Sequence, residues 1–154
     1  MTFRNIRTVG LLGIVGCFLV AQFIPVQRTN PPAKGDVSAP PGVEATLRRA
    51  CYDCHSNETR WPWYTRVAPF SWLAAHDVEL GRRQIDFSEW GEYYPSTRKR
   101  KLRWMDRALR QEAMPPWSYR IFHSGARLTA QDRAALERWI DSEISSPSPD
   151  SRNK

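Results

Sequence analysis

Five consecutive residues, Cys51-Tyr52-Asp53-Cys54-His55, carry the clearest chemistry in this 154-residue chain. Cysteines at positions i and i+3 lie on one side of a helical turn, so each thiol can add to one vinyl group of the same porphyrin. The imidazole that follows then lies beneath the iron as its proximal ligand. Cys-x-x-Cys-His is the attachment signature of haem c. It predicts one haem, bound covalently through Cys51 and Cys54 and ligated by His55.

Other uses of the two cysteines are open. A structural zinc site needs four ligands, and residues 43–144 offer only two further histidines beyond the motif. A thioredoxin-like redox pair needs a βαβ context, for which the sequence gives no sign. A disulfide across this short loop would leave His55 without a role. Haem accounts for all three side chains.

The second axial ligand of the iron has three candidates. Met114 lies in the segment Ala113-Met114-Pro115-Pro116, where the prolines end a helix and stiffen the chain. Such a rigid loop can hold a thioether in place, so we favour Met114. His76 and His123 are the alternatives, and each could instead hydrogen-bond a propionate or a backbone carbonyl. An iron with no second protein ligand is the remaining possibility.

Seven tryptophans are many for a chain of this length. Such rings need a hydrophobic core or a large flat ligand to pack against. Three of them follow the motif closely along the chain. We expect Trp61, Trp63 and Trp72 to wall the porphyrin and to exclude water from it.

The overall composition is that of a globular protein, with 41% hydrophobic and 25% charged residues. The net charge of +7 favours anionic partners. A basic run, Arg98-Lys99-Arg100-Lys101 with Arg103, is the only segment that suggests nucleic-acid binding. We interpret it as a solvated helix face or a docking patch for an acidic redox partner protein, and we expect no nucleic acid to bind.

The N-terminal segment is apolar. Val9 to Val26 is an uncharged run of 18 residues that would span roughly 27 Å as a helix, just enough to cross a bilayer. Arg4 and Arg7 precede it, which predicts a cytoplasmic N-terminus. Residues 1–26 are therefore expected to form an uncleaved anchor in the bacterial inner membrane, with the haem domain in the periplasm. A cleaved signal peptide, or a lipoprotein signal ending at Cys17, is the alternative.

Apolar periodicity predicts an all-α body. Residues recur at helical spacing from Val43, between Leu102 and Leu109, and from Thr129, where Asp132 suggests a capping box. Prolines mark 27–42 as an extended linker and 145–154 as a disordered tail. The haem c domain is thus expected to cover residues 43–144.

These residues resemble the haem-binding-domain family of small membrane-anchored bacterial c-type cytochromes, which are distantly similar to class I cytochromes c. The resemblance runs from about Val43 to Asp141, and only Asp86 stands where an asparagine would be expected. It implies a cytochrome c-like helical fold wrapped around one covalent haem. The matching segments are Cys51–Ser56, Trp61-Pro62-Trp63-Tyr64, Ala68-Pro69, Ser71-Trp72, His76, Gly81-Arg82, Phe87–Trp90, Met114-Pro115-Pro116, Tyr119, His123, Leu128-Thr129 and Trp139.

The function expected from these features is electron transfer by a mono-haem c-type cytochrome at the outer face of the inner membrane, and not enzymatic catalysis. A haem c enzyme that reduces peroxide, or a gas or redox sensor with an open distal site, is the alternative. A haem-bearing structural subunit of a larger membrane complex is a third.

Overall fold

The structure, a computed structural model, describes residues 3–146. These residues form seven α-helices and three short 3-10 helices, and their only β-type pairing is an isolated bridge between Gly35 and Glu89. The all-α prediction is confirmed. The helices are α1 (Phe3–Ala21), α2 (Pro41–Ala50), α3 (Tyr52–His55), η1 (Trp63–Arg66), α4 (Phe70–Gln84), η2 (Trp90–Glu92), α5 (Pro95–Arg110), α6 (Trp117–Phe122), η3 (Ser124–Ala126) and α7 (Ala130–Ser145).

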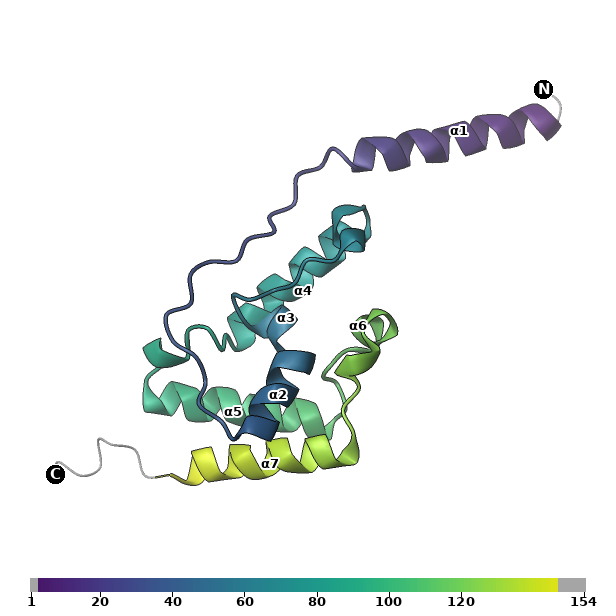
Figure 1. The fold of residues 1–154 in the computed structure, drawn as a ribbon. Helices are drawn as coiled ribbons and strands as arrows, with labels where there is room; N and C mark the ends of the chain where they lie inside the picture. Colours follow the sequence, from purple (N-terminus) through teal and green to yellow (C-terminus); the bar gives the residue numbers. More distant parts are fainter. Residues whose placement is uncertain (1–2, 147–154) are drawn as a thin grey trace.

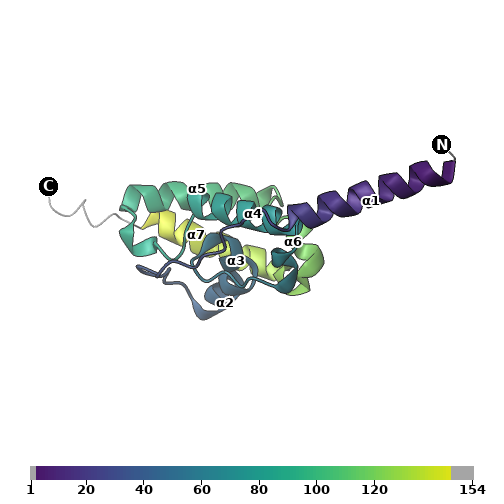
Figure 2. The ribbon, with the colours of Figure 1, turned by 90° about the horizontal axis from the view of Figure 1, so that it is seen from above.

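The body is built on two long helices, α5 and α7, which lie side by side (Figures 1 and 2). Helix α2 packs on α7 and continues almost directly into α3, which in turn packs on α4. Helix α1 projects away from this body, and α6 lies at one side of it, close to η3 (Figure 1). The short helix α3 therefore lies in the middle of the arrangement.

The hydrophobic core forms where these helices meet. The predicted apolar faces of α5 and α7 are buried, as are the inward residues of α2 and the segment that follows α4. Burial of each such side chain contributes roughly 1.5–3 kcal/mol. The least exposed core residues are Leu47, Ile85, Phe87, Leu102, Leu136 and Ile140.

The start of α7 follows the sequence prediction closely. The Thr129 hydroxyl accepts a hydrogen bond from the Asp132 backbone N–H at 3.1 Å, and the Asp132 carboxylate accepts one from the Thr129 N–H at 2.8 Å. This reciprocal pair is the predicted capping box. It satisfies two backbone donors and fixes the first turn of the helix.

The predicted membrane-spanning helix is wrong. Helix α1 ends at Ala21, where the Gln22 side chain turns back to the Phe18 carbonyl and also accepts a hydrogen bond from the Ala68 N–H at 2.9 Å. Only Val9 to Ala21 of the apolar run is helical, a length of about 20 Å against the roughly 30 Å of a hydrocarbon core. No helix in residues 3–146 is both long and apolar enough to cross a membrane. The predicted single-pass inner-membrane anchor, on which the expected periplasmic location rested, is overturned with it.

The proline-rich segment that precedes α2 is extended, but it does not hang free of the body. Arg28 and Asn30 donate hydrogen bonds to the carbonyls of Thr65 and Thr59, and Val37 is buried in the core with 5% of its surface exposed. We call residues 28–40 the strap, because they run along the helical body (Figure 1). The segment predicted as a linker is therefore extended and packed against the body over the strap. The predicted tail, 145–154, lies outside the described residues from position 147 onward.

Candidate functional site

The five-residue motif is a single helical turn between two longer helices. The Cys51 N–H bonds to the Leu47 carbonyl at 2.8 Å, and the His55 N–H bonds to the Cys51 carbonyl at 2.9 Å. Cys51 and Cys54 are free thiols and are partly buried. Burial raises the pKa of each thiol to about 12, so both sulfurs are protonated at neutral pH.

One cavity of about 340 Å³ brings the predicted ligands together. Cys51, Cys54, His55 and Met114 all line it. Its volume lies within the range of cofactor sites, about 300–1,000 Å³, and its wall is largely apolar, as such sites require. The remaining lining residues are Ala50, Asp77, Leu80, Gly81, Gln84, Ile85, Phe87, Trp104, Met105, Ala108, Leu109, Pro115, Pro116, Ser118 and Tyr119.

The imidazole of His55 is held in one orientation. Its Nδ1 lies 2.9 Å from the Gly81 carbonyl oxygen and 3.1 Å from that of Ile85. Carbonyl oxygens only accept, so we assign the ring proton to Nδ1, which leaves the lone pair on Nε2. Burial lowers the pKa of this imidazole, which favours the neutral form that a metal needs. His55 is thus prepared to bind a metal through Nε2.

A glycine lets α4 approach the motif. A Cβ built on Gly81 would lie 2.9 Å from the carbonyl carbon of Cys54 and 3.1 Å from its Cβ. Contacts this short exclude any larger residue. The absence of a side chain at Gly81 therefore brings its carbonyl within hydrogen-bonding distance of His55.

Met114 is delivered by the end of α5. The Ala113 N–H bonds to the Ala108 carbonyl and the Glu112 N–H bonds to the Leu109 carbonyl, both at 3.0 Å. This pair is the Schellman motif, and Glu112 occupies its left-handed position with φ of 53°. The chain reverses there and places Met114 at the cavity, followed by Pro115, which is buried.

Neither alternative ligand lines this cavity, although His123 lines a cavity that adjoins it. His76 is exposed on α4 and faces a separate, open groove. His123 follows α6, where its two ring nitrogens lie 3.1 Å from the Tyr119 carbonyl and 3.3 Å from the Tyr64 hydroxyl. Neither histidine lines the cavity that contains His55.

Only part of the predicted tryptophan wall is at the site. Trp61 lines a second cavity of about 310 Å³, which adjoins the first because both share Cys54, Asp77, Ser118 and Tyr119 in their walls. Trp63 is 77% exposed and Trp72 is 36% exposed, and neither lines these two cavities.

Sequence reasoning missed Trp104, which does line the cavity and whose ring centroid is 6.1 Å from that of His55. Trp104 and Ala108 are four residues apart on α5, and each directly precedes a buried residue, Met105 and Leu109 respectively. The helical spacing could therefore have identified Trp104, although it lies just after a run of basic residues.

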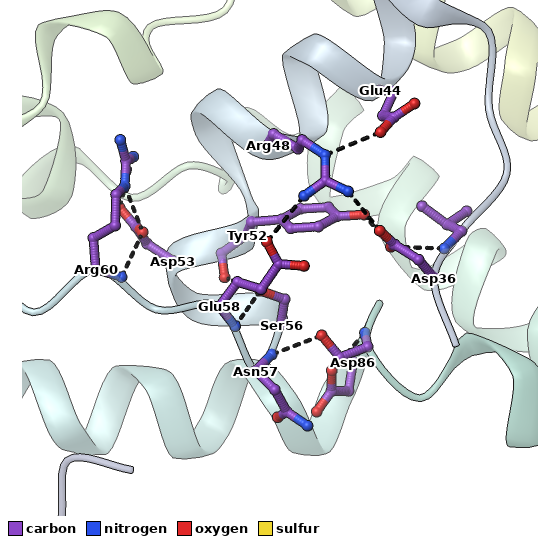
Figure 3. Close-up of polar contacts among 12 residues, drawn as sticks. Asp36, Glu44, Arg48, Tyr52, Asp53, Ser56, Asn57, Glu58, Arg60 and Asp86 are labelled. Atoms are coloured by element: carbon purple, nitrogen blue, oxygen red, sulfur yellow. Dashed lines mark hydrogen bonds and ion pairs between the residues drawn. The ribbon is translucent and has the colours of Figure 1, made fainter. Parts of the chain in front are cut away.

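Polar contacts hold α3 from two sides (Figure 3). On one side, Tyr52 donates a hydrogen bond from its hydroxyl to Asp36 of the strap, and the Arg48 guanidinium lies over its ring at 4.7 Å. Arg48 also forms ion pairs with Asp36, Glu44 and Glu58.

On the other side of α3, Asp53 accepts hydrogen bonds from the Arg60 guanidinium at 3.1 Å and from the Tyr119 hydroxyl at 2.6 Å. Burial works against ionisation of Asp53, but the bonds from Arg60 and Tyr119 outweigh it and lower its pKa. Asp53 is therefore a buried, paired carboxylate inside the motif.

The donor set fits haem. One buried imidazole nitrogen, one thioether and two thiols line a single apolar cavity. The described residues, those of this cavity included, contain no group of three or more His, Cys, Asp or Glu side chains that could hold a metal ion by themselves.

Comparison with protein families gives one match: a family model described as a haem-binding domain covers residues 16–142, more than four fifths of the chain. Comparison with curated proteins found no match, and comparison with solved structures found none either.

Proposed function

Because this chain belongs to the haem-binding domain family, we propose that it binds its haem covalently and serves as a mono-haem c-type cytochrome that carries single electrons. The observation that supports this proposal most directly is the shared cavity. Both thiols of the motif, the buried His55 and Met114 line the same apolar wall.

Each residue has a distinct role in holding the haem. The Cys51 and Cys54 thiols would each add across one vinyl group, with sulfur bonding one carbon and the hydrogen going to the other. His55 would bind the iron through Nε2, since Nδ1 is engaged with carbonyls. Met114 would offer its thioether as the second ligand. Bound haem supplies a one-electron couple at this position.

A carrier agrees with this cavity better than an enzyme or a sensor does. Peroxide reduction or gas sensing needs an open distal position, whereas Met114 lines the same cavity as His55 and can occupy that position. The apolar wall excludes water, which favours the less charged, reduced iron, and thioether ligation acts in the same direction. We therefore propose a high reduction potential and no catalytic role.

The partner we propose is a redox protein with an acidic face, and not a nucleic acid. The basic run lies in the first half of α5, the helix that ends at the Met114 loop. Lys99 donates a hydrogen bond to the Ser146 carbonyl and Lys101 donates one to the Gln84 carbonyl, both at 2.6 Å. Arg100 and Arg103, by contrast, are exposed. These two exposed charges can meet an acidic partner.

Covalent attachment is tested directly by extraction. In acid–acetone, wild-type haem is expected to stay with the polypeptide, because thioether bonds do not dissociate. The double variant Cys51→Ala/Cys54→Ala is expected to lose the haem-stained band on a denaturing gel. Cys17→Ala, which removes an exposed cysteine on α1, is the matched control and is expected to keep it. Haem that extracts freely from the wild type would refute covalent attachment.

A further inference from the structure

Helix α6 carries no buried residue. It follows Met114-Pro115-Pro116 directly, and it lies beside the body instead of within it (Figure 1). Pro115 before α6 is buried, and the Phe122 ring contacts those of Tyr64 and Phe70. Because no residue of α6 itself is buried, polar contacts must also hold the helix in place.

The shortest of these contacts reaches the attachment motif. The Tyr119 hydroxyl donates to Asp53 Oδ2 at 2.6 Å, and the Asp53 residue is 6% exposed. Asp53 lies between the two cysteines, on the same helical turn as His55. One hydrogen bond thus joins the turn that carries the proximal ligand to the helix that follows Met114.

Asp53 is well prepared to accept this bond. Arg60 donates to it from the backbone N–H at 3.0 Å and from the guanidinium at 3.1 Å, which fixes the carboxylate. Hydrogen bonds to charged groups are stronger than those between neutral groups. The other ring contacts of this segment, from His123 and Phe122 to Tyr64 of η1 and from Phe122 to Phe70 of α4, do not reach the motif.

We propose that Asp53 and Tyr119 are positioning residues whose hydrogen bond keeps Met114 at the cavity. The inference rests on the proposed function, since it presumes that His55 and Met114 ligate one iron. Only four residues separate Met114 from Tyr119, and two of them are prolines, so movement at one is transmitted to the other. Loss of the bond raises the population of molecules in which the thioether has left the iron.

The test uses the haem-loaded full chain and measures carbon monoxide association with the reduced protein. Carbon monoxide binds only when Met114 is displaced, so its rate reports the displaced population. Tyr119→Phe removes the hydroxyl and keeps the ring that stacks on His123 at 4.0 Å. Its association rate is expected to rise roughly ten- to a hundredfold, the effect of losing one hydrogen bond to a charged group. Hydrogen exchange of amides 117–123 is expected to accelerate with it.

A second pair of variants changes the acceptor. Asp53→Ala is expected to accelerate association as Tyr119→Phe does. Asp53→Asn keeps one acceptor oxygen, so its increase is expected to be clearly smaller. Tyr93→Phe is the matched control, because it removes a hydroxyl that bonds the Asp86 N–H at 3.2 Å, far from α6 in the chain. It is expected to lower stability and leave the association rate at the wild-type value.

Two results overturn the inference alone: wild-type rates in both Tyr119→Phe and Asp53→Ala, or an equal acceleration in Tyr93→Phe. A different result would disprove the proposed ligands themselves. If the oxidised wild type lacks a methionine–iron charge-transfer band, or if Met114→Ala leaves that band in place, then Met114 is not the ligand. The inference about Asp53 and Tyr119 is then wrong as well.

Discussion

Gly81 of α4 lies against the Cys54 carbonyl of α3 so closely that a methyl group at Gly81 would be 2.9 Å from the carbonyl carbon. The same glycine accepts the hydrogen bond of His55 Nδ1 at 2.9 Å. One residue without a side chain thus sets both the spacing of the two helices and the orientation of the His55 imidazole, the proposed iron ligand.

Gly81→Ala is expected to destabilise the protein by about 1–3 kcal/mol, the usual effect of overpacking. In an open helix the same change would stabilise it by roughly 0.5–1 kcal/mol, so the sign itself is diagnostic. Thermal unfolding measures the change in stability, and haem staining measures whether the variant still retains haem. Gly125→Ala is the control, because a Cβ there would meet only Arg49 at an ordinary 3.9 Å. Equal stability of the two variants would contradict the close approach.

Met114→Ala is expected to abolish the weak long-wavelength methionine–iron band, lower the reduction potential and open the iron to carbon monoxide. His76→Ala and His123→Ala are expected to retain the band, because neither side chain lines the cavity. Absorbance spectra of the oxidised variants decide the point. A high-spin spectrum in either histidine variant, with an unchanged Met114→Ala, would assign the site as bis-histidine.

Glu112→Gly is expected to stabilise the protein by roughly 0.5–1 kcal/mol, because glycine adopts a φ of 53° without strain. Urea unfolding measures the gain. The neighbouring Gln111 has an ordinary φ of −83°, so Gln111→Gly is expected to bring no gain. If Glu112→Gly is the less stable of the two, the left-handed end of α5 is disproved.

Asp86→Asn is expected to stabilise the protein at neutral pH. Burial raises the pKa of this carboxyl, so its ionisation costs stability as the pH rises above the unfolded value of about 3.9. Asparagine keeps the oxygen that accepts the Ser88 N–H at 2.9 Å. The gain in the free energy of unfolding is expected to grow as the pH rises from about 4 through the folded-state pKa of Asp86, and then to level off.

Asp132→Asn is the control for the pH profile, because its effect on the free energy of unfolding is expected to have the opposite sign. The Thr129 N–H lowers the pKa of Asp132 to about 2. Its carboxylate therefore stabilises the fold above the unfolded pKa, and that stability is lost as the pH falls from about 4 to about 2. Parallel pH profiles for Asp86→Asn and Asp132→Asn would contradict both assignments.

Charge reversal at Arg100 and Arg103 is expected to slow reduction by an acidic redox protein without altering the absorbance spectrum. The wild-type rate is expected to fall as salt is added, since charges are screened over about 10 Å at 0.1 M. Stopped-flow reduction at two salt concentrations measures both effects. If the reduction rate responds neither to charge reversal nor to added salt, the basic run 98–103 is solvated helix surface and not a docking patch.

The features that the sequence predicts well are local ones. Cys51, Cys54 and His55 fall within five residues, so one helical turn is enough to place them on a common wall. The apolar faces of α5 and α7 follow from spacing along a single helix, and the Thr129 cap follows from its own first turn.

The features that the sequence does not predict depend on contacts between distant segments. Helix α1 stops short because Gln22 turns toward Ala68, a contact that an apolar run does not encode. Trp63 and Trp104 could each have faced the cofactor by type alone. Only the packing of α5 near the motif decides that Trp104 lines the cavity and Trp63 faces solvent.

The buried position of Val37 in the strap sets a limit on how the protein can be shortened. Val37 belongs to the same core cluster as Leu47 and Phe87, and Asp36 accepts a hydrogen bond from the hydroxyl of Tyr52, which lies within the Cys51–His55 motif. A recombinant fragment trimmed at residue 43, where helical periodicity begins, would lose a piece of its own interior. The shortest fragment that retains these contacts begins before Asp36.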